Sequence, residues 1–322
     1  MRAAQLTREA VSSGFYRYGL FTTFGLLVIV FTLLNRNFLS FPNAINLLQQ
    51  TASTGIAAAG LVFVLVSGGI DISMGSTIFL SSVIVTTLAN RGMGLVGAFA
   101  VALGCGVAVG VLNGFFVAVL RVVPLIVTLA SLYVVRGVAL ALTGVQSLFF
   151  FNDVGEAVAY RRLGGVIPVV VIILVATLLV VQVVLSRTLF GRQLFAIGNN
   201  AAGAQVMGIR VRRNTFLTYV ISGGLAGLAG LVSGAQVGAI TPTFAEGQEF
   251  IIITSAILGG VSLFGGKGTA FPGAFLGVLI VMCIENGLVM AGANMYLYTI
   301  VRGVVIFFAV MLDCLRNTGE LR

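Results

Sequence analysis

The 322-residue sequence is 59% hydrophobic, has 8% charged residues and has a mean hydropathy of +1.13, so it is far more apolar than a soluble domain. Its net charge of +9 does not imply a nucleic-acid partner, because basic residues in so apolar a chain are better explained by membrane topology. The sequence has no histidine, which excludes Ser-His-Asp catalysis and imidazole metal ligands, and its three cysteines lack the spacing of a metal site.

Apolar segments recur along nearly the whole chain, so we expect an all-α, polytopic membrane protein made of a single domain, 1–322. About ten transmembrane helices are expected. They cover roughly 16–34, 53–68, 74–90, 95–120, 125–143, 165–185, 215–237, 249–263, 270–291 and 295–313.

The first span resembles a signal peptide, because Arg2, Arg8 and Arg17 precede its apolar run. No small-residue cleavage site follows, so we expect the span to be retained. Between the first two spans, 41–48 has the pattern of a short amphipathic helix at the membrane interface, with Asn or Ser as its cap.

The basic residues favour an orientation with both termini in the cytoplasm. Most of the 18 Lys and Arg residues then lie in inner segments, as the positive-inside rule requires. The outer segments hold Arg36, Arg91, Arg161 and Arg162. In this topology 145–164 is a periplasmic loop and 186–214 is a cytoplasmic segment.

A glycine-rich stretch with one carboxylate, 67–76, interrupts the apolar sequence between the second and third spans. Irregular backbone is not tolerated against lipid, so this break must face protein, water or the membrane surface. Asp71, at the cytoplasmic side of the second span, is either a cap or turn carboxylate that satisfies amides of this hinge, or a gate or pathway residue. The eighth span is also short and ends in a glycine pair, Gly259-Gly260.

Pairs of glycines one helical turn apart indicate closely packed helices, because small residues allow helix backbones to approach each other. The pairs are Gly106 and Gly110, Gly223 and Gly227, Gly230 and Gly234, and Gly273 and Gly277. The segments 133–138 and 298–304 have similar sequences and lie in the fifth and tenth spans. An inverted-topology repeat would produce this offset of five spans, and a coincidence is the alternative.

Arg136 and Arg302 fall inside the fifth and tenth spans, where a guanidinium costs ~2.5–3.5 kcal/mol on insertion scales. They should face the bundle interior, a cavity or a carboxylate, and Glu249, Glu285 and Asp313 are the candidate partners. Structural ion pairing and substrate contact are both open, and ion pairing is the favoured interpretation.

The cytoplasmic segment predicts a two-helix elbow, with 198–200 as the break and Gly208 as the final cap. A solvated loop is the alternative. The segment is rich in Phe, Leu, Ile and Met, however, and an apolar patch in water favours a docking surface. The sequence 265–269 only superficially resembles a phosphate-binding loop, because glycine follows Lys267 and no strand precedes it.

Three stretches resemble the ribose/xylose/arabinose-type ABC sugar permeases. The stretch 68–76 resembles their GGIDLSVGS signature, 188–209 resembles their cytoplasmic coupling region, and 258–269 resembles their LGGVSLxGGKGT stretch. The final span also matches over 301–303 and 309–313. Met74 replaces a usual valine and Asn199 a usual glycine; asparagine tolerates the left-handed conformation, so the turn can survive.

The resemblance implies a bacterial inner-membrane permease subunit of an ABC importer with a type II-like fold. It implies a second permease copy, ABC ATPase subunits on the inner face and a periplasmic sugar-binding protein. The chain itself then needs no cofactor, since ATP and Mg²⁺ belong to the ATPase.

Two groups of candidate site residues follow from the motifs and from the buried charges. The ATPase-coupling candidates are Phe190, Gly191, Arg192, Ala196, Gly198, Asn199, Asn200, Met207 and Gly208. The gate or pathway candidates are Gly68, Gly69, Asp71, Ser73, Gly75, Arg136, Glu249, Gly259, Gly260 and Arg302.

Two other functions compete with a sugar ABC permease. A branched-chain amino-acid ABC permease would share the fold but has no GGID signature. An ion-coupled secondary transporter would need carboxylates inside its spans, and only Glu285 and, marginally, Glu249 lie there. Neither the sugar nor the choice between a homodimer and a heterodimer follows from the sequence.

Overall fold

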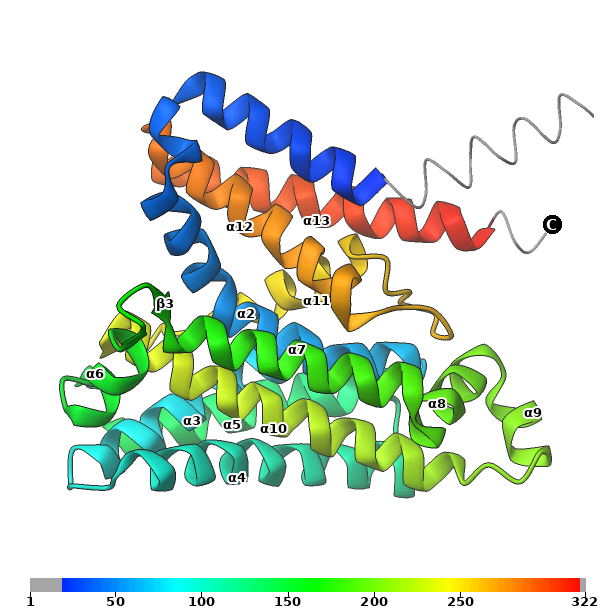
Figure 1. Cartoon of the computed structure of the whole chain (residues 1–322). Coiled ribbons are helices and arrows are strands. Elements are labelled where there is room, and N and C mark those ends of the chain that lie inside the picture. The colour runs from blue at the N-terminus through cyan, green and yellow to red at the C-terminus, as the bar shows by residue number, and fades with distance from the viewer. Residues whose placement is uncertain (1–18, 319–322) are drawn as a thin grey trace, which may run out of the picture.

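The computed structural model describes residues 19–318, and their regular structure is helical apart from two short two-stranded pairs (Figure 1). The all-α class is therefore confirmed. The longer helices are the N-terminal helix (Gly19–Leu34), α2 (Phe41–Val66), α3 (Met74–Ala89), α4 (Leu95–Gly114), α5 (Pro124–Thr143), α7 (Val169–Arg187), α8 (Leu189–Asn199), α10 (Val211–Val237), α11 (Gln248–Leu258), α12 (Phe275–Met290) and α13 (Met295–Thr318). The short elements are η1 (Arg36–Leu39), η2 (Phe115–Val119), β1 (Leu148–Phe149), α6 (Asp153–Ala159), β2 (Arg162–Leu163), β3 (Ile167–Pro168), α9 (Ala201–Val206), β4 (Ala239–Ile240) and η3 (Ala270–Ala274).

Within residues 19–318, six helices are long and apolar enough to cross a membrane by length and composition. They are Phe41–Val66, Leu95–Val119, Pro124–Thr143, Val169–Arg187, Val211–Val237 and Ala270–Met290. Shorter apolar helices occupy the other four predicted spans: Gly19–Leu34, Met74–Ala89, Gln248–Leu258 and Thr299–Met311. That these four also cross stays a prediction. So does the cytoplasmic placement of both ends, because residues 1–18 and 319–322 lie outside the described residues.

The prediction of a separate helix at 41–48 is wrong, because these residues form the first turns of α2, one 26-residue helix. Ser40 caps this helix by accepting a hydrogen bond from the Asn43 backbone N–H (3.4 Å), so serine is the cap of the two residue types predicted. The Asn43 side chain is buried and donates to the carbonyl of Phe38 (2.8 Å) and to Oδ1 of Asn286 on α12 (3.0 Å). This anchoring joins the first turn of α2 to α12, and a position of the segment at the membrane interface stays a prediction.

Helices α4 and α10 cross with their backbones in contact, which confirms the packing predicted from the glycine pairs. A Cβ atom at Gly106 would lie 2.0 Å from the carbonyl oxygen of Gly223, and one at Gly223 would lie 2.3 Å from that of Gly106. One turn away, a Cβ atom at Gly227 would lie 2.0 Å from the carbonyl oxygen of Ala102. Such close approach gains dispersion contacts that lipid cannot replace.

The second half of the chain packs in a corresponding way. Helix α10 packs against α3 and α4, whereas α2 packs against α11 and α12; likewise α3 packs against α5, and α11 against α13. A glycine crossing recurs too, since a Cβ atom at Gly277 on α12 would lie 1.9 Å from the carbonyl oxygen of Ser255 on α11. These pairings match under an offset of five predicted spans, and they favour the internal repeat over a coincidence.

The predicted periplasmic loop, 145–164, and the predicted cytoplasmic elbow, within 186–214, lie at opposite ends of the molecule. Figure 1 shows α6 and β3 at one end and α8 and α9 at the other. Strand β1 pairs antiparallel with β4, which directly follows α10, and Phe150 beside β1 is buried. The segment 145–164 is therefore an ordered cap on this end of the bundle.

Candidate functional site

The break between α2 and α3 is a tight turn that α10 holds from the side. Gly68 has φ of +80°, a conformation that glycine adopts without steric penalty. Gly69 donates its N–H to the carbonyl of Val64 (2.9 Å), and a Cβ atom on it would lie 2.8 Å from the Tyr219 hydroxyl oxygen. That hydroxyl donates to the carbonyl of Ile70 (3.1 Å). A larger residue at either glycine would disturb this turn.

Asp71 is buried in the hinge, with only 1% of its surface exposed. Its Oδ1 accepts hydrogen bonds from the backbone N–H (3.0 Å) and the hydroxyl (2.6 Å) of Ser73, and its Oδ2 accepts one from the Ser222 hydroxyl (3.2 Å). The geometry is that of a turn carboxylate, one of the two predicted alternatives. The amide that it binds, that of Ser73, lies within the hinge, as this alternative requires. Burial with several donors makes Asp71 an organising group of the hinge.

The polar network continues into residues that the sequence analysis missed. The Ser73 hydroxyl accepts a hydrogen bond from Nδ2 of Asn113 on α4 (2.8 Å), and Oδ1 of Asn113 accepts one from the hydroxyl of Ser131 on α5. The network therefore links the hinge to α4, α5 and α10. Asn113 could have been found, because it is the one carboxamide in an apolar stretch of 25 residues and polar groups inside spans are costly.

We predict that Ser73→Ala destabilises the protein by about 1–3 kcal/mol, because it removes one donor from Asp71 and leaves Nδ2 of Asn113 without its buried acceptor. Unfolding by SDS titration in mixed micelles measures this effect. The matched control is Ser186→Ala, since Ser186 is exposed and its hydroxyl only bonds the Gln182 carbonyl within its own helix. Equal stability of the two variants would contradict the role assigned to the network.

Glu249 and Arg136 lie beside the start of α3. Glu249 is 6% exposed, and its Oε2 has no hydrogen-bond partner among the described residues. A Cβ atom at Gly75 would lie 2.1 Å from this oxygen, so glycine there makes room for the carboxylate. Arg136 donates from Nη1 to the Phe244 carbonyl (3.4 Å), and its guanidinium carbon lies 5.2 Å from the ring centroid of Phe79.

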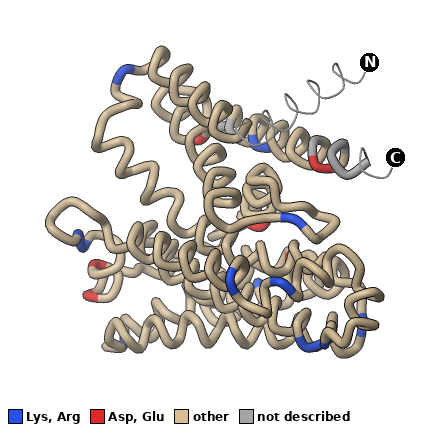
Figure 2. Tube along the Cα trace, turned by 45° about the vertical axis from the view of Figure 1, so that its right-hand side comes forward, with Lys and Arg blue, Asp and Glu red and all other residues tan. Residues whose placement is uncertain are grey.

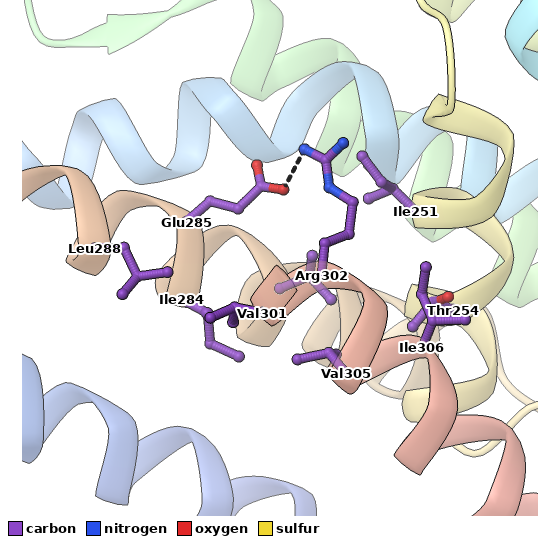
Figure 3. Close-up of a pocket in the computed structure, with 10 residues that line it drawn as sticks. Ile251, Thr254, Ile284, Glu285, Leu288, Val301, Arg302, Val305 and Ile306 are labelled. Atoms are coloured by element: carbon purple, nitrogen blue, oxygen red, sulfur yellow. Dashed lines mark hydrogen bonds and ion pairs between the residues drawn. The ribbon is translucent and has the colours of Figure 1, made fainter. Parts of the chain in front are cut away.

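The predicted ion pair is thus wrong for Arg136, which contacts a carbonyl and an aromatic ring and joins no carboxylate in the described part of the chain. It is confirmed for Arg302. The Nη2 atom of Arg302 on α13 lies 2.8 Å from Oε1 of Glu285 on α12, as Figure 3 shows. Both side chains are about one-third exposed, at 37% and 30%, so the pair borders open space. Asp313, the third candidate partner, accepts the backbone N–H of Leu263 (3.1 Å).

The predicted two-helix elbow is present as α8 and α9, but the break predicted at 198–200 is shorter, because Gly198 and Asn199 still belong to α8 and only Asn200 separates the two helices. The hydroxyl of Thr188 caps α8 at Gly191 N–H (3.2 Å), and Oδ1 of Asn200 caps α9 at Gly203 N–H (2.9 Å). Gly208, with φ of +83°, follows the end of α9 as expected. Asn199 lies inside α8, so the expected left-handed conformation at this residue is wrong.

The elbow meets the end of α2 and the loop 259–269 at three residues that we call the elbow junction: Val66, Gly198 and Gly266. Gly266 N–H donates to the carbonyl of Val66 at the end of α2 (2.9 Å). A Cβ atom at Gly198 would lie 2.0 Å from that carbonyl oxygen and 2.3 Å from the Gly266 nitrogen. Three segments far apart in sequence thus meet with their backbones in contact.

The remaining coupling candidates divide into inward and outward groups. Phe190 packs on Phe63 of α2 with ring centroids 6.1 Å apart, and Gly191 is buried against the carbonyl of Leu185. Ala196 is half-buried beside them. Arg192 and Met207 point outward and are exposed. The elbow therefore has one face fixed to the membrane bundle and one free face.

The second glycine pair ends α11 much as Gly68 follows the end of α2. Gly260 has φ of +88°, and a Cβ atom at Gly259 would lie 2.4 Å from the carbonyl oxygen of Gly273. The break after α2 and the break after α11 are adjacent, because Gly266 in the loop after α11 bonds to Val66 at the end of α2. The gate candidates therefore form two groups: one around the hinge and junction, and one at Arg302, which lies seven residues into α13.

Comparisons with known proteins agree with this architecture. Residues 43–310 match the family described as "Branched-chain amino acid transport system / permease component". The chain belongs to this permease family. The ribose import permease protein RbsC of Bacillus subtilis is 36% identical over 303 residues (92% of each chain).

Two further relatives of this family come from Escherichia coli K12. Its ribose import permease protein RbsC is 33% identical over 291 residues (89% of this chain, 90% of the relative), and its D-allose transport system permease protein AlsC is 34% identical over 303 residues (92% and 91%). No solved structure matches the chain. Family membership makes the protein a multi-pass membrane component of a transport system and not an enzyme.

Proposed function

We propose that this chain is the membrane permease of a bacterial ABC importer that translocates a monosaccharide or related polyol across the inner membrane. The observation that carries the proposal is similarity over about nine-tenths of the chain to permeases whose names state ribose or D-allose transport. ATP and Mg²⁺ would be bound by separate ATPase subunits. A periplasmic binding protein would deliver the sugar, and a second permease copy would complete the pathway.

The charge distribution supports a topology with the elbow in the cytoplasm. Figure 2 shows Lys and Arg gathered toward the end that carries α8 and α9, with few at the end that carries α6. The positive-inside rule places the richer end in the cytoplasm. With ten spans, both termini would lie on that side.

The free face of the elbow supports an ATPase-docking role. Val206 and Met207 at the end of α9 expose 90% and 71% of their surfaces, and Arg192 on α8 is also exposed. Apolar side chains held out in this way mark partner surfaces. The buried face of α8, through Gly191 and the elbow junction, would pass movement of the ATPase to the two helix breaks.

We expect Arg192→Glu to abolish ATP-driven sugar uptake while leaving the permease inserted in the membrane, because the reversed charge lies on the free face and breaks no internal contact. Uptake of D-ribose is measured in proteoliposomes that hold the permease, its ATPase and its binding protein. Arg161→Glu, an exposed change at the opposite end, is the matched control. Gly191→Trp would also abolish uptake, but by deforming the elbow itself, so it is the weaker test.

Three outcomes would refute the proposal in different ways. Normal uptake by Arg192→Glu would remove the docking role. ATP-driven uptake of leucine but of no sugar would instead assign the chain to the branched-chain amino-acid branch that the family description names. Sugar flux through the chain alone, without an ATPase, would favour a secondary transporter.

A further inference from the structure

A polar cavity of about 720 Å³ opens at the end of the molecule opposite the elbow, and no function described so far uses it. Its walls come from the first half of α2, the end of α10, the start of α11, and from α6, α12 and α13. Arg302 and Glu285, which Figure 3 shows paired, lie on its lining. Arg302 lies seven residues into α13, so the cavity reaches roughly 10 Å below the helix end. We call this cavity the outer vestibule.

Several carboxamides line the outer vestibule with no internal partner. The side chains of Asn46, Gln49, Gln50 and Gln248 make no hydrogen bond to another described residue of the protein, although all four lie on the lining. Gln236 is different, because its Nε2 donates to the carbonyl of Gln49 (2.7 Å) and fixes one wall. A carboxamide carries two donors and an acceptor, so this wall presents many unused groups of both kinds.

The charges on the lining balance. Arg162 and Arg302 are matched by Glu246 and Glu285, so the outer vestibule has no net charge. The Nε atom of Arg302 is buried and unpartnered among the described residues, because its pair with Glu285 uses only Nη2. A neutral wall dense in donors and acceptors suits an uncharged polyhydroxyl ligand better than an anion or an amino-acid zwitterion with an apolar side chain.

We propose that the outer vestibule is a low-affinity sugar site in the permease itself, which receives the monosaccharide when the binding protein releases it. The proposal rests on the proposed function and deepens it. The free carboxamides hydrogen-bond the sugar hydroxyls in place of water, and the Arg302–Glu285 pair forms the floor. Weak binding is expected, because a wet, open cavity returns little desolvation energy and a transporter must release its cargo.

Saturation-transfer NMR on the full chain in nanodiscs tests the site, with D-ribose, D-allose and L-arabinose as probes and L-leucine as the comparison compound. We expect saturation of at least one sugar and none of leucine. Gln49→Leu and Gln248→Leu should each weaken sugar binding about fivefold, the effect of losing one neutral hydrogen bond. Gln146→Leu is the matched control, because Gln146 is exposed at the same end but outside the vestibule.

The same variants are then measured in the assembled importer. The proposal predicts a higher half-saturating concentration of loaded binding protein for Gln49→Leu and Gln248→Leu, with unchanged thermal stability. No saturation of any of the three sugars, or equal saturation in the vestibule variants and Gln146→Leu, would overturn the site. If sugar uptake by the wild-type importer persists in that case, the proposed function survives and only the vestibule is lost.

Discussion

Gly106→Leu is expected to prevent stable assembly of the helix bundle. The side chain would have to occupy space now filled by the Gly223 carbonyl oxygen, which lies 2.0 Å from the Cβ position. Overfilling a well-packed site usually costs about 1–3 kcal/mol and sometimes more. Here the obstacle is backbone on both helices, so neither partner can move aside alone, and we expect the upper end of that range or beyond.

The measurement is the yield and thermal stability of the detergent-solubilised protein, followed by size-exclusion chromatography of a fluorescent fusion. Gly104→Leu is the matched control, because it adds the same side chain to the same helix at a site with no atom within 4 Å of the Cβ position. If Gly106→Leu behaves like Gly104→Leu, then the α4–α10 crossing does not hold the bundle together.

Features that depend on local sequence periodicity could be predicted well. The ten apolar segments coincide with ten helices, and the glycine pairs on α4 and α10 meet because a four-residue spacing places both on one face. The elbow was also predictable, since Asn200 and Gly208 are strong helix-boundary residues.

Features that depend on a partner from a distant segment could not be predicted. The side chain of Asn43 at the start of α2 bonds to Asn286, which lies 243 positions away. Arg136 has sequence surroundings similar to those of Arg302, yet one faces a carbonyl and a ring and the other a carboxylate. Sequence gives the cost of burying such a group but not the identity of the group that offsets it.

Asn199 shows a different limit. The resemblance to related permeases placed asparagine where glycine is usual, and a left-handed turn was the simplest explanation. The structure keeps Asn199 helical and brings it close to Gly266 instead, since a Cβ atom there would lie 2.2 Å from Asn199 Oδ1. Glycine at position 266 is therefore required by the close approach of Asn199 as much as by its own backbone conformation.

The elbow junction makes Gly198 the position where a single methyl group should uncouple ATP hydrolysis from transport. We expect Gly198→Ala to lower sugar uptake by roughly five- to 150-fold, if separating the elbow from α2 costs about 1–3 kcal/mol in the coupled arrangement. The free face, with Arg192 and Met207, is untouched, so the ATPase should still dock and hydrolyse ATP.

Three measurements separate uncoupling from misfolding: co-purification of the ATPase, ATP hydrolysis by the reconstituted complex, and D-ribose uptake. Gly203→Ala is the matched control on the same elbow, because the atoms nearest its Cβ position belong to the flexible Asn200 side chain at 3.2 Å. Uptake should be normal in Gly203→Ala and lost in Gly198→Ala while both retain the ATPase. Full uptake by Gly198→Ala would mean that force reaches the helix breaks by a route other than the Val66–Gly198–Gly266 contact.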